Sequence, residues 1–200
     1  MRGKEKKEIF KTPLGWAGLT VSDQGICRIV LPRKQKQDVQ RELESSERAR
    51  PGSDRKRTQA GGVPACAMHA DRRLSELPSG VNITLKKTGA NLRKYFSGNR
   101  VLFDLPLDMR YYTRFQKAVW RAAVGIPYGE TRSYAWVAKK IGNPRAVRAV
   151  GQALGANPVP IIIPCHRVIG SSGKLCGFAG GLTMKRKLLE LEAGKVARRA

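Results

Sequence analysis

The apolar and polar residues between positions 8 and 31 follow a pattern that predicts β-strands. The segments GWAGLTV and GICRIVL are largely apolar, and the stretch Ser22-Asp23-Gln24-Gly25 separates them. Gly25 can adopt positive φ without steric cost, as tight turns require. The first part of the chain therefore predicts a β-hairpin within a small antiparallel sheet.

A polar stretch follows the hairpin. Residues 33–58 contain nine basic and five acidic residues, and their only large aliphatic residues are Val39 and Leu43. Such a stretch buries too little apolar area to offset the entropy lost on ordering. We expect a basic, exposed and mobile loop over about 33–70, with room for a short helix around 38–48.

Beyond this loop the apolar spacing becomes helical. Leu85, Leu92 and Tyr95 suit a helix that stops at Ser97, where serine, glycine and asparagine follow one another. The segment VLFDLPL then suits a strand and a link into the second half of the chain, where a further helical pattern begins at Thr113. Strands are thus expected mainly at the beginning of the chain and helices in the remainder.

The segment TRSYAWVAKKIGNPRAVRAVGQALG carries two helix patterns separated by a tight break. Ser133 can cap the first helix and Gly142 can end it. Asn143 can cap the second helix with Pro144 at its first position, where a missing N–H is harmless. The residues spaced to bury one face of this second helix are Val147, Val150 and Leu154. The pattern predicts a helix-turn-helix with a basic outer face, although an αα-hairpin within a bundle would have the same spacing.

These elements divide the chain into two predicted domains. Residues 1–108 would form an α/β domain around the small antiparallel sheet, and residues 109–200 a mainly α domain that contains the helix-turn-helix. No repeat of 20 to 50 residues is apparent, so we expect two different domains and no repeat architecture.

The charge of the chain points to a polyanionic partner. There are 39 Lys and Arg against 15 Asp and Glu, a net charge of +24, and residues 109–200 alone carry 17 basic and three acidic residues. Each phosphate that such a surface neutralises releases counterions and adds affinity whatever the base sequence. Nucleic acid is the first candidate, while an anionic membrane or a merely basic surface remain alternatives.

The chain carries no pattern for secretion or membrane insertion. Its first ten residues, MRGKEKKEIF, are charged, and no apolar run reaches the ~20 residues of a membrane span. A cytoplasmic protein is therefore predicted, or a nuclear one in a eukaryote.

The four cysteines, at positions 27, 66, 165 and 176, have no tight repeated spacing. A reducing compartment disfavours disulfides, so each thiol has to be considered by itself. Cys27, Cys66 and His69 are weak candidates for a metal site because no fourth ligand is evident. No cofactor is predicted.

The segment IIIPCHRVIG places Cys165 and His166 side by side after an apolar run. A thiol reacts as thiolate, and an ordinary cysteine pKa near ~8.5 leaves little thiolate at neutral pH. His166 could act as base if the backbone is irregular here, as the prolines around 158–164 suggest, and Glu190 or Glu192 could orient it. A buried structural cysteine is the simpler alternative.

The wider context resembles a known family. PCHRV, preceded by NPVPIII and followed by SSGKLCGFAGGL and KRKLLELE, is similar to the O6-alkylguanine-DNA alkyltransferases. The similarity runs from about Asn91 to Glu192 and includes FQKAVW, IPYGETRSYAWVA and NPRAVRAVGQALGANP. Several motifs in the same order make chance similarity a poor explanation.

The resemblance implies a direct and irreversible repair reaction. Duplex DNA would be the partner, an O6-alkylated guanine would be flipped out of the helix, and Cys165 would take the alkyl group once per molecule, with a monomer acting alone. His166 would be a water-linked base oriented by Glu192. Tyr134 would help to protonate the guanine, and Asn157 would shape the turn beside the thiol.

The same resemblance assigns further residues and the folds of the domains. It implies a ribonuclease-H-like N-terminal domain and a winged-helix-like C-terminal domain. Arg148 would fill the gap left by the flipped base. The other DNA-contacting residues would be Ser133, Arg145, Ala149, Gly151 and Gln152. The substrate pocket would consist of Pro160, Val168, Gly177, Phe178, Ala179 and Gly180.

The sequence departs from the family pattern in the segment that covers the alkyl group. Phe178 stands where many members have tyrosine, and Ala179 where some have serine, which puts the range of accepted alkyl groups in doubt. Two rival functions remain. Non-catalytic lesion-binding relatives lack the cysteine that this chain has, and a Cys-His hydrolase would not need so basic a C-terminal half.

Overall fold

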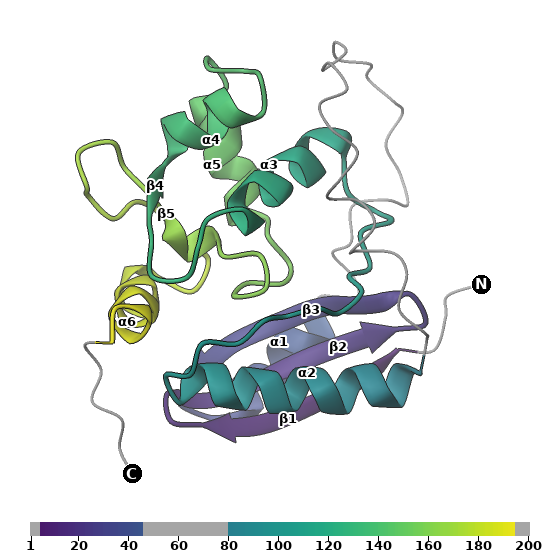
Figure 1. Cartoon of the computed structure of the whole chain (residues 1–200). Helices are drawn as coiled ribbons and strands as arrows, with labels where there is room; N and C mark the ends of the chain where they lie inside the picture. The colour runs from purple at the N-terminus through teal and green to yellow at the C-terminus, as the bar shows by residue number, and fades with distance from the viewer. Residues whose placement is uncertain (1–4, 46–79, 195–200) are drawn as a thin grey trace.

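The computed structural model describes residues 5–45 and 80–194 (Figure 1). A three-stranded antiparallel sheet contains β1 (Lys6–Thr12), β2 (Gly15–Ser22) and β3 (Gly25–Arg33) in that order. The helices are α1 (Lys36–Ser45), α2 (Val81–Phe96), α3 (Arg114–Val124), α4 (Tyr134–Lys140), α5 (Val147–Gly155) and α6 (Leu182–Glu192). Two short strands, β4 (Arg132–Ser133) and β5 (Val168–Ile169), pair in parallel, and a 3-10 turn, η1, spans Cys165–Arg167.

The sheet is covered by a helix on each face, with α2 in front of it and α1 behind it in Figure 1. The residues of β2 alternate between the two sides. Leu19 and Val21 face the main core with Leu92 of α2, whereas Trp16 packs on the side of α1. The predicted hairpin between β2 and β3 is confirmed, and the structure adds β1 as its third strand.

The predicted mobile loop over 33–70 is wrong for its first part, whereas the short helix expected around 38–48 is confirmed with an earlier start. Arg33 ends β3, and α1 begins three residues later. Val39 and Leu43 lie one helical turn apart and are fully buried against Val30, so these two aliphatic side chains suffice to dock the helix. Residues 46–79, with the metal candidates Cys66 and His69, lie outside the described residues.

The predicted strand VLFDLPL is also wrong. The segment forms a single isolated bridge, in which Ile26 N donates to Pro106 O at 2.8 Å and Asp108 N donates to Ile26 O at 2.9 Å. Pro106 has no N–H to extend the ladder, and Leu102 is 84% exposed and packs into no sheet face. The segment is instead an extended connection between the two halves of the chain.

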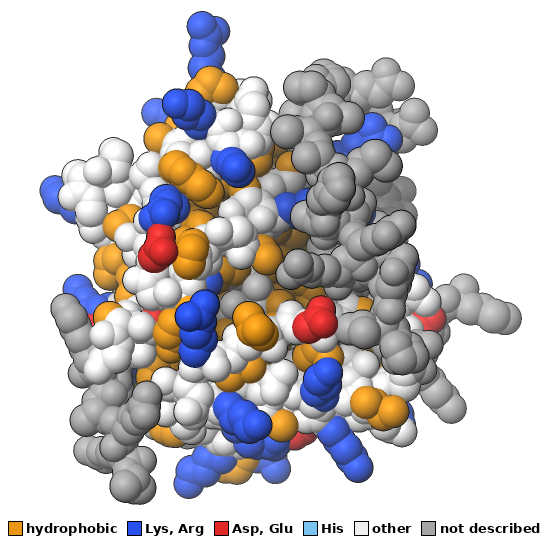
Figure 2. Space-filling view, in the orientation of Figure 1, with side chains coloured by type: hydrophobic (Ala, Val, Ile, Leu, Met, Phe, Trp, Pro, Cys, Tyr) orange, Lys and Arg blue, Asp and Glu red, His pale blue; other side chains and the backbone are white. Residues whose placement is uncertain are grey.

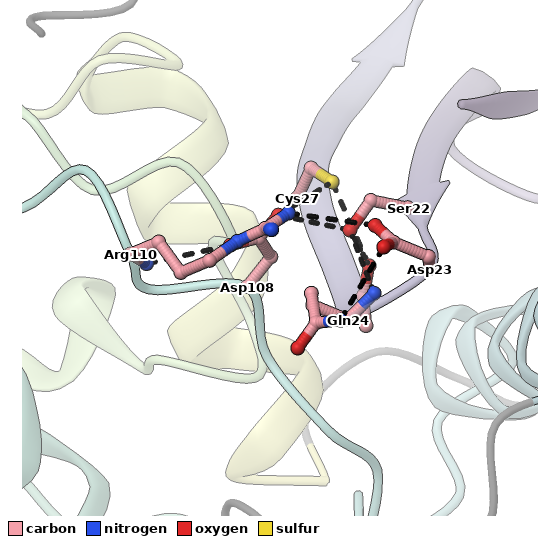
Figure 3. A network of polar contacts seen from close by, with 7 residues as sticks. Ser22, Asp23, Gln24, Cys27, Asp108 and Arg110 are labelled. Carbon is pink, nitrogen blue, oxygen red and sulfur yellow. Dashed lines mark hydrogen bonds and ion pairs between the residues drawn. The ribbon is translucent and has the colours of Figure 1, made fainter. Parts of the chain in front are cut away.

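A buried carboxylate fastens this connection to the β2–β3 turn (Figure 3). Asp108 Oδ2 accepts hydrogen bonds from Ser22 Oγ at 2.8 Å and Arg110 Nη2 at 2.8 Å, and Oδ1 accepts from Arg110 Nε at 2.9 Å. Burial alone would raise the pKa of Asp108, but the hydrogen bonds from Arg110 and Ser22 outweigh it and lower that pKa. The Cys27 thiol lies 3.9 Å from Oδ2, so this candidate metal ligand belongs to the network.

Replacing Asp108 with asparagine should destabilise the protein by about 2 kcal/mol, because hydrogen bonds to a charged acceptor are lost. A lowered carboxyl pKa stabilises the fold above the ordinary aspartate value near ~4, and this contribution disappears as the pH falls through the native pKa. Urea unfolding should therefore show a large difference from wild type at pH 7 that shrinks below about pH 4. The exposed Asp104→Asn is the control, and an equal loss of stability in both variants would refute this account.

Helix α3 begins where the sequence predicts. Thr113 Oγ1 accepts a hydrogen bond from Gln116 N, and the Gln116 side chain accepts one from Thr113 N, which is a complete capping box. On the inner face Trp120 is buried, and its Nε1 donates to Ala153 O at 2.8 Å. This bond joins α3 to α5.

The helix-turn-helix consists of α4 and α5. Ser133 Oγ accepts from Trp136 N at 3.0 Å, as a cap should, and Gly142 has the positive φ of 74° that ends α4. The second start was predicted wrongly, because residues 143–146 form a turn and α5 begins at Val147. Val147 is also 37% exposed, so the buried face begins at Val150.

One continuous cluster of buried apolar residues connects the two halves. It extends from Phe10 in the sheet through Trp120 and Val150 to Leu191 in α6. Within the described residues, no helix combines the length and the apolar character that crossing a membrane requires. The core thus positions the sheet against the segment that holds Cys165.

Candidate active site

Cys165 lies on irregular backbone, as the prolines suggested. Ile161 has a φ of 78°, which is rare for a β-branched residue, and Cys165 N donates to Ile163 O at 2.8 Å before η1 begins. Since Cys165 and His166 stand on a tight turn, strand geometry does not force them onto opposite faces.

The thiol is buried and held by an amide. Cys165 is 6% exposed, and Asn157 Nδ2 donates to its Sγ at 3.0 Å and to Ile163 O at 2.8 Å. Burial raises the pKa of Cys165 to about 11, although the Asn157 hydrogen bond and the Lys185 charge act in the opposite direction. At neutral pH the resting cysteine is a thiol, so an attack by this sulfur requires a group that takes its proton.

His166 lies against Glu192. The Nε2 atom of His166 is 2.8 Å from Glu192 Oε1, and both side chains are fully buried. Burial lowers the pKa of His166 despite the carboxylate, so the ring is neutral and Nε2 carries the proton that the carboxylate accepts. Nδ1 is then an acceptor, and it is buried without a hydrogen-bond partner among the described residues.

Glu192 is stabilised as an anion by a second pair of donors. Arg167 Nε and Nη2 donate to its two oxygens at 2.8 and 2.9 Å, and Gly129 N donates to Oε2 at 3.1 Å. Burial would raise the pKa of Glu192, but these bonds and the one from His166 hold it far below its usual range. Glu190, the alternative considered from the sequence, is exposed.

Lys185 is a site residue that sequence reasoning missed. Its side chain is completely buried, and Nζ donates to Val168 O at 2.6 Å, Cys176 O at 3.1 Å and the Tyr134 hydroxyl at 3.4 Å. Helical spacing offered a signal, because Lys185 shares a face of α6 with Leu188. A lysine on a buried face is rarely a simple packing residue.

Tyr134 stands at the start of α4, beside α5. Burial raises its pKa to about 12, so the hydroxyl remains a proton donor at neutral pH. A β-carbon at Gly151 would lie 3.8 Å from the Tyr134 ring, an ordinary contact distance, so the ring lies directly beside this part of α5. The sequence placed both residues at the site, and the structure brings them together.

The predicted pocket residues lie on both sides of the thiol segment. Pro160 and Val168 are buried, whereas Gly177 and Ala179 are exposed and Phe178 and Gly180 are half-buried. Cys176 is exposed as well. A cavity of about 390 Å³ between β3 and this region is lined in part by Asn157, Pro160, Ala179 and Gly180.

The predicted DNA-contacting residues lie on α5 and in the segments that precede it. Arg145, Arg148 and Gln152 are exposed, and Ala149 and Gly151 are partly buried. Ser133 caps α4. In Figure 2 Lys and Arg side chains are spread over the visible face and Asp and Glu are few, as the net charge of +24 requires.

The metal candidates do not assemble in the part of the chain that the structure describes. No group of three His, Cys, Asp or Glu residues there could hold an ion. Cys27 is buried beside Asp108, and Cys66 and His69 lie outside the described ranges.

Comparison with known proteins places these features in one family. Residues 114–194 match the model of the 6-O-methylguanine DNA methyltransferase DNA-binding domain. The methylated-DNA–protein-cysteine methyltransferase of Methanosarcina acetivorans is 53% identical over 107 residues, which are 54% of this chain and 68% of that protein. The chain belongs to the methylated-DNA–protein-cysteine methyltransferase family.

The Mycobacterium tuberculosis H37Rv methyltransferase is 58% identical over 104 residues, 52% of this chain. The matched part spans 62% of that relative's length. The crystal structure of M. tuberculosis OGT in complex with DNA covers more, with 35% identity, a TM-score of 0.65, 94% of this chain and 93% of the other. The methyltransferase fold therefore covers almost the whole chain, well beyond the 52% that the sequence match covers.

Proposed function

We propose that this protein repairs O6-alkylguanine in duplex DNA by moving the alkyl group onto Cys165 in a single, irreversible turnover. The observation that carries the proposal is that the buried Nδ1 of His166 is an acceptor with no hydrogen-bond partner among the described residues. This acceptor belongs to the residue that directly follows Cys165, whose sulfur is a thiol at neutral pH, while Nε2 is bound to Glu192. A neutral, oriented imidazole next to a thiol is the arrangement that nucleophilic catalysis by cysteine requires.

In the proposed reaction the Cys165 proton passes through one water to His166 Nδ1, and Glu192 stabilises the imidazolium that forms. The sulfur attacks the alkyl carbon, the new S–C bond replaces the bond between that carbon and guanine O6, and the thioether remains on the protein. Tyr134, whose raised pKa keeps it protonated, donates a proton to the departing guanine and regains one afterwards, so that in net the proton that Cys165 gave to His166 ends on guanine. Lys185 and Asn157 favour the thiolate over the thiol.

DNA binding would use α5 and the turn before it. Arg145 and Gln152 would contact the DNA backbone, and Arg148 would fill the gap left by the flipped guanine. Ser133, Ala149 and Gly151 would line the approach of the duplex. Base extrusion costs a few kcal/mol, which an inserted side chain and phosphate contacts offset. The small residues on this helix suit close approach to a minor groove.

The finer description of the fold belongs to the same proposal. Residues 1–108 would be a ribonuclease-H-like domain and residues 109–200 a winged-helix-like domain, acting as a monomer. The pocket residues Pro160, Val168 and Gly177 to Gly180 would enclose the guanine and its alkyl group. Because Phe178 and Ala179 carry no hydroxyl, backbone groups of this segment would have to contact the substrate oxygen.

The test is intact mass spectrometry after mixing with duplex DNA that contains one O6-methylguanine. Wild type should gain a single methylene equivalent that maps to Cys165, and Cys165→Ser should gain none. Cys176→Ser, which removes an exposed thiol, should react like wild type. Binding to the lesion without any gain in mass would contradict the proposal and leave a lesion-recognition protein.

A further inference from the structure

Tyr95 reaches the site from the opposite end of the chain. It lies near the end of α2, is 1% exposed, and donates its hydroxyl hydrogen to Glu192 Oε1 at 2.7 Å. The same hydroxyl oxygen is 3.3 Å from His166 Nε2. A side chain of the N-terminal half therefore contacts both members of the His166–Glu192 pair.

We propose that Tyr95 is a positioning residue in the alkyl transfer. By donating a hydrogen bond to Glu192, its hydroxyl weakens the attraction of that carboxylate for the proton of His166. The inference rests on the proposed function and extends it, because the N-terminal half then completes the proton relay and does more than support the fold.

The argument begins with the number of donors on one oxygen atom. Glu192 Oε1 accepts from His166 Nε2, Arg167 Nη2 and the Tyr95 hydroxyl, at 2.8, 2.9 and 2.7 Å. A carboxylate oxygen that accepts several hydrogen bonds is a weaker acceptor for each of them. Without the Tyr95 hydroxyl, the negative charge on Oε1 is shared by fewer donors and stabilises the imidazolium of His166 more strongly.

The neighbouring charged groups also act on the pKa of His166. Arg167 and Lys185 both disfavour a proton on His166, and Glu192 favours one. Tyr95 itself remains neutral, because burial and the adjacent carboxylate raise its pKa well above the usual value. Among the described residues, Tyr128 and Cys165 are further titratable neighbours, and neither is altered in a Tyr95 variant. Loss of the hydroxyl should therefore raise the pKa of His166.

The ring of Tyr95 has a separate packing role. Its centroid lies 5.6 Å from that of Phe96 and 6.3 Å from those of Phe103 and Tyr128. Tyr95→Phe keeps these ring contacts and removes only the oxygen. This variant thus separates the polar role from the structural one.

The experiment measures the single-turnover rate of transfer against pH for wild type and Tyr95→Phe. Protonated His166 cannot accept the thiol proton, so the rate should fall on the acid side with the pKa of His166. In Tyr95→Phe this acid limb should move up by about one pH unit. The plateau rate should stay within about twofold of wild type, because a more basic imidazole still takes the proton.

Tyr111→Phe, which removes the hydroxyl of an exposed tyrosine, is the matched control and should leave the profile unchanged. A purely structural role for Tyr95 predicts the opposite pattern, a lower plateau with an unmoved acid limb. That pattern, or an unchanged profile, would overturn the inference. If wild type transfers nothing, the proposed function fails instead.

A second measurement does not depend on activity. The chain has two histidines, His69 and His166, so a His69→Gln background leaves one imidazole to follow by nitrogen NMR. The inference expects the His166 titration to move up in Tyr95→Phe and to stay in place in Tyr111→Phe. An unmoved titration would refute it whether or not the DNA reaction occurs.

Discussion

Replacing Glu192 with glutamine will lower the rate of alkyl transfer by at least about 100-fold, the contribution expected of an oriented base. It will also destabilise the fold by about 3–5 kcal/mol, because it removes the negative partner of a buried ion pair and leaves the positive one uncompensated. The glutamine amide presents N–H groups where Arg167 also presents N–H groups, and the buried guanidinium loses its partner. Single-turnover kinetics and urea unfolding measure the two effects.

The exposed Glu190→Gln makes the same chemical change two residues earlier in α6 and should alter neither quantity by much. The destabilisation should also depend on pH. Since the pKa of Glu192 is lowered in the fold, its contribution is present above the ordinary glutamate value near ~4.3 and disappears only in strong acid. A variant with normal stability at pH 7 would show that the Arg167–Glu192 pair is unimportant.

If Arg148 fills the gap left by the flipped guanine, as proposed, replacing it with alanine should reduce repair of duplex DNA by about 10- to 100-fold, because a base-flipping cost of a few kcal/mol is no longer offset. Stability should not change, because Arg148 is exposed on α5. In single-stranded DNA the same lesion is not paired with a second strand, so less free energy is needed to expose it. Repair of this substrate by Arg148→Ala should therefore fall by less than about threefold. Rates on the two substrates measure the difference.

Arg186→Ala, an equal loss of charge at an exposed position of α6, is the control for electrostatics alone. It should affect duplex and single-stranded substrates to the same small extent. Equal losses on both substrates in Arg148→Ala would contradict a role in base flipping and would assign Arg148 to phosphate binding.

Much of the local structure was predictable because it depends on short-range chemistry. The β2–β3 hairpin follows from Gly25, the start of α3 from the Thr113 capping box, and the start of α4 from Ser133. Predictions failed where a few long-range contacts decide the outcome. A short helix around 38–48 was expected, but not that Val39 and Leu43 would dock it, because no local composition reveals that β2 and β3 offer them a surface.

The residues of the active site also fall into those that the sequence indicates and those that only long-range contacts reveal. The motif around Cys165, with His166 one residue later and Glu192 as a candidate partner, could be found in the sequence because these residues stand in recognisable order. Helical spacing was the only signal for Lys185 and nothing indicated Tyr95, since each acts through a contact with residues far away in the chain. Tyr95 is 97 positions from Glu192, and the bond forms only because α2 packs against the segment that carries His166.

The sequence by itself determined the chemistry available to this protein: a strongly basic chain, two short helices suited to DNA, and one cysteine preceded by prolines and followed by histidine. The tertiary structure decided which of these groups are charged and which are neutral. Burial of Cys165, His166 and Glu192 in one core sets their protonation, because the energy of a buried charge depends on every donor within reach. Those donors come from both halves of the chain, and only folding brings them together.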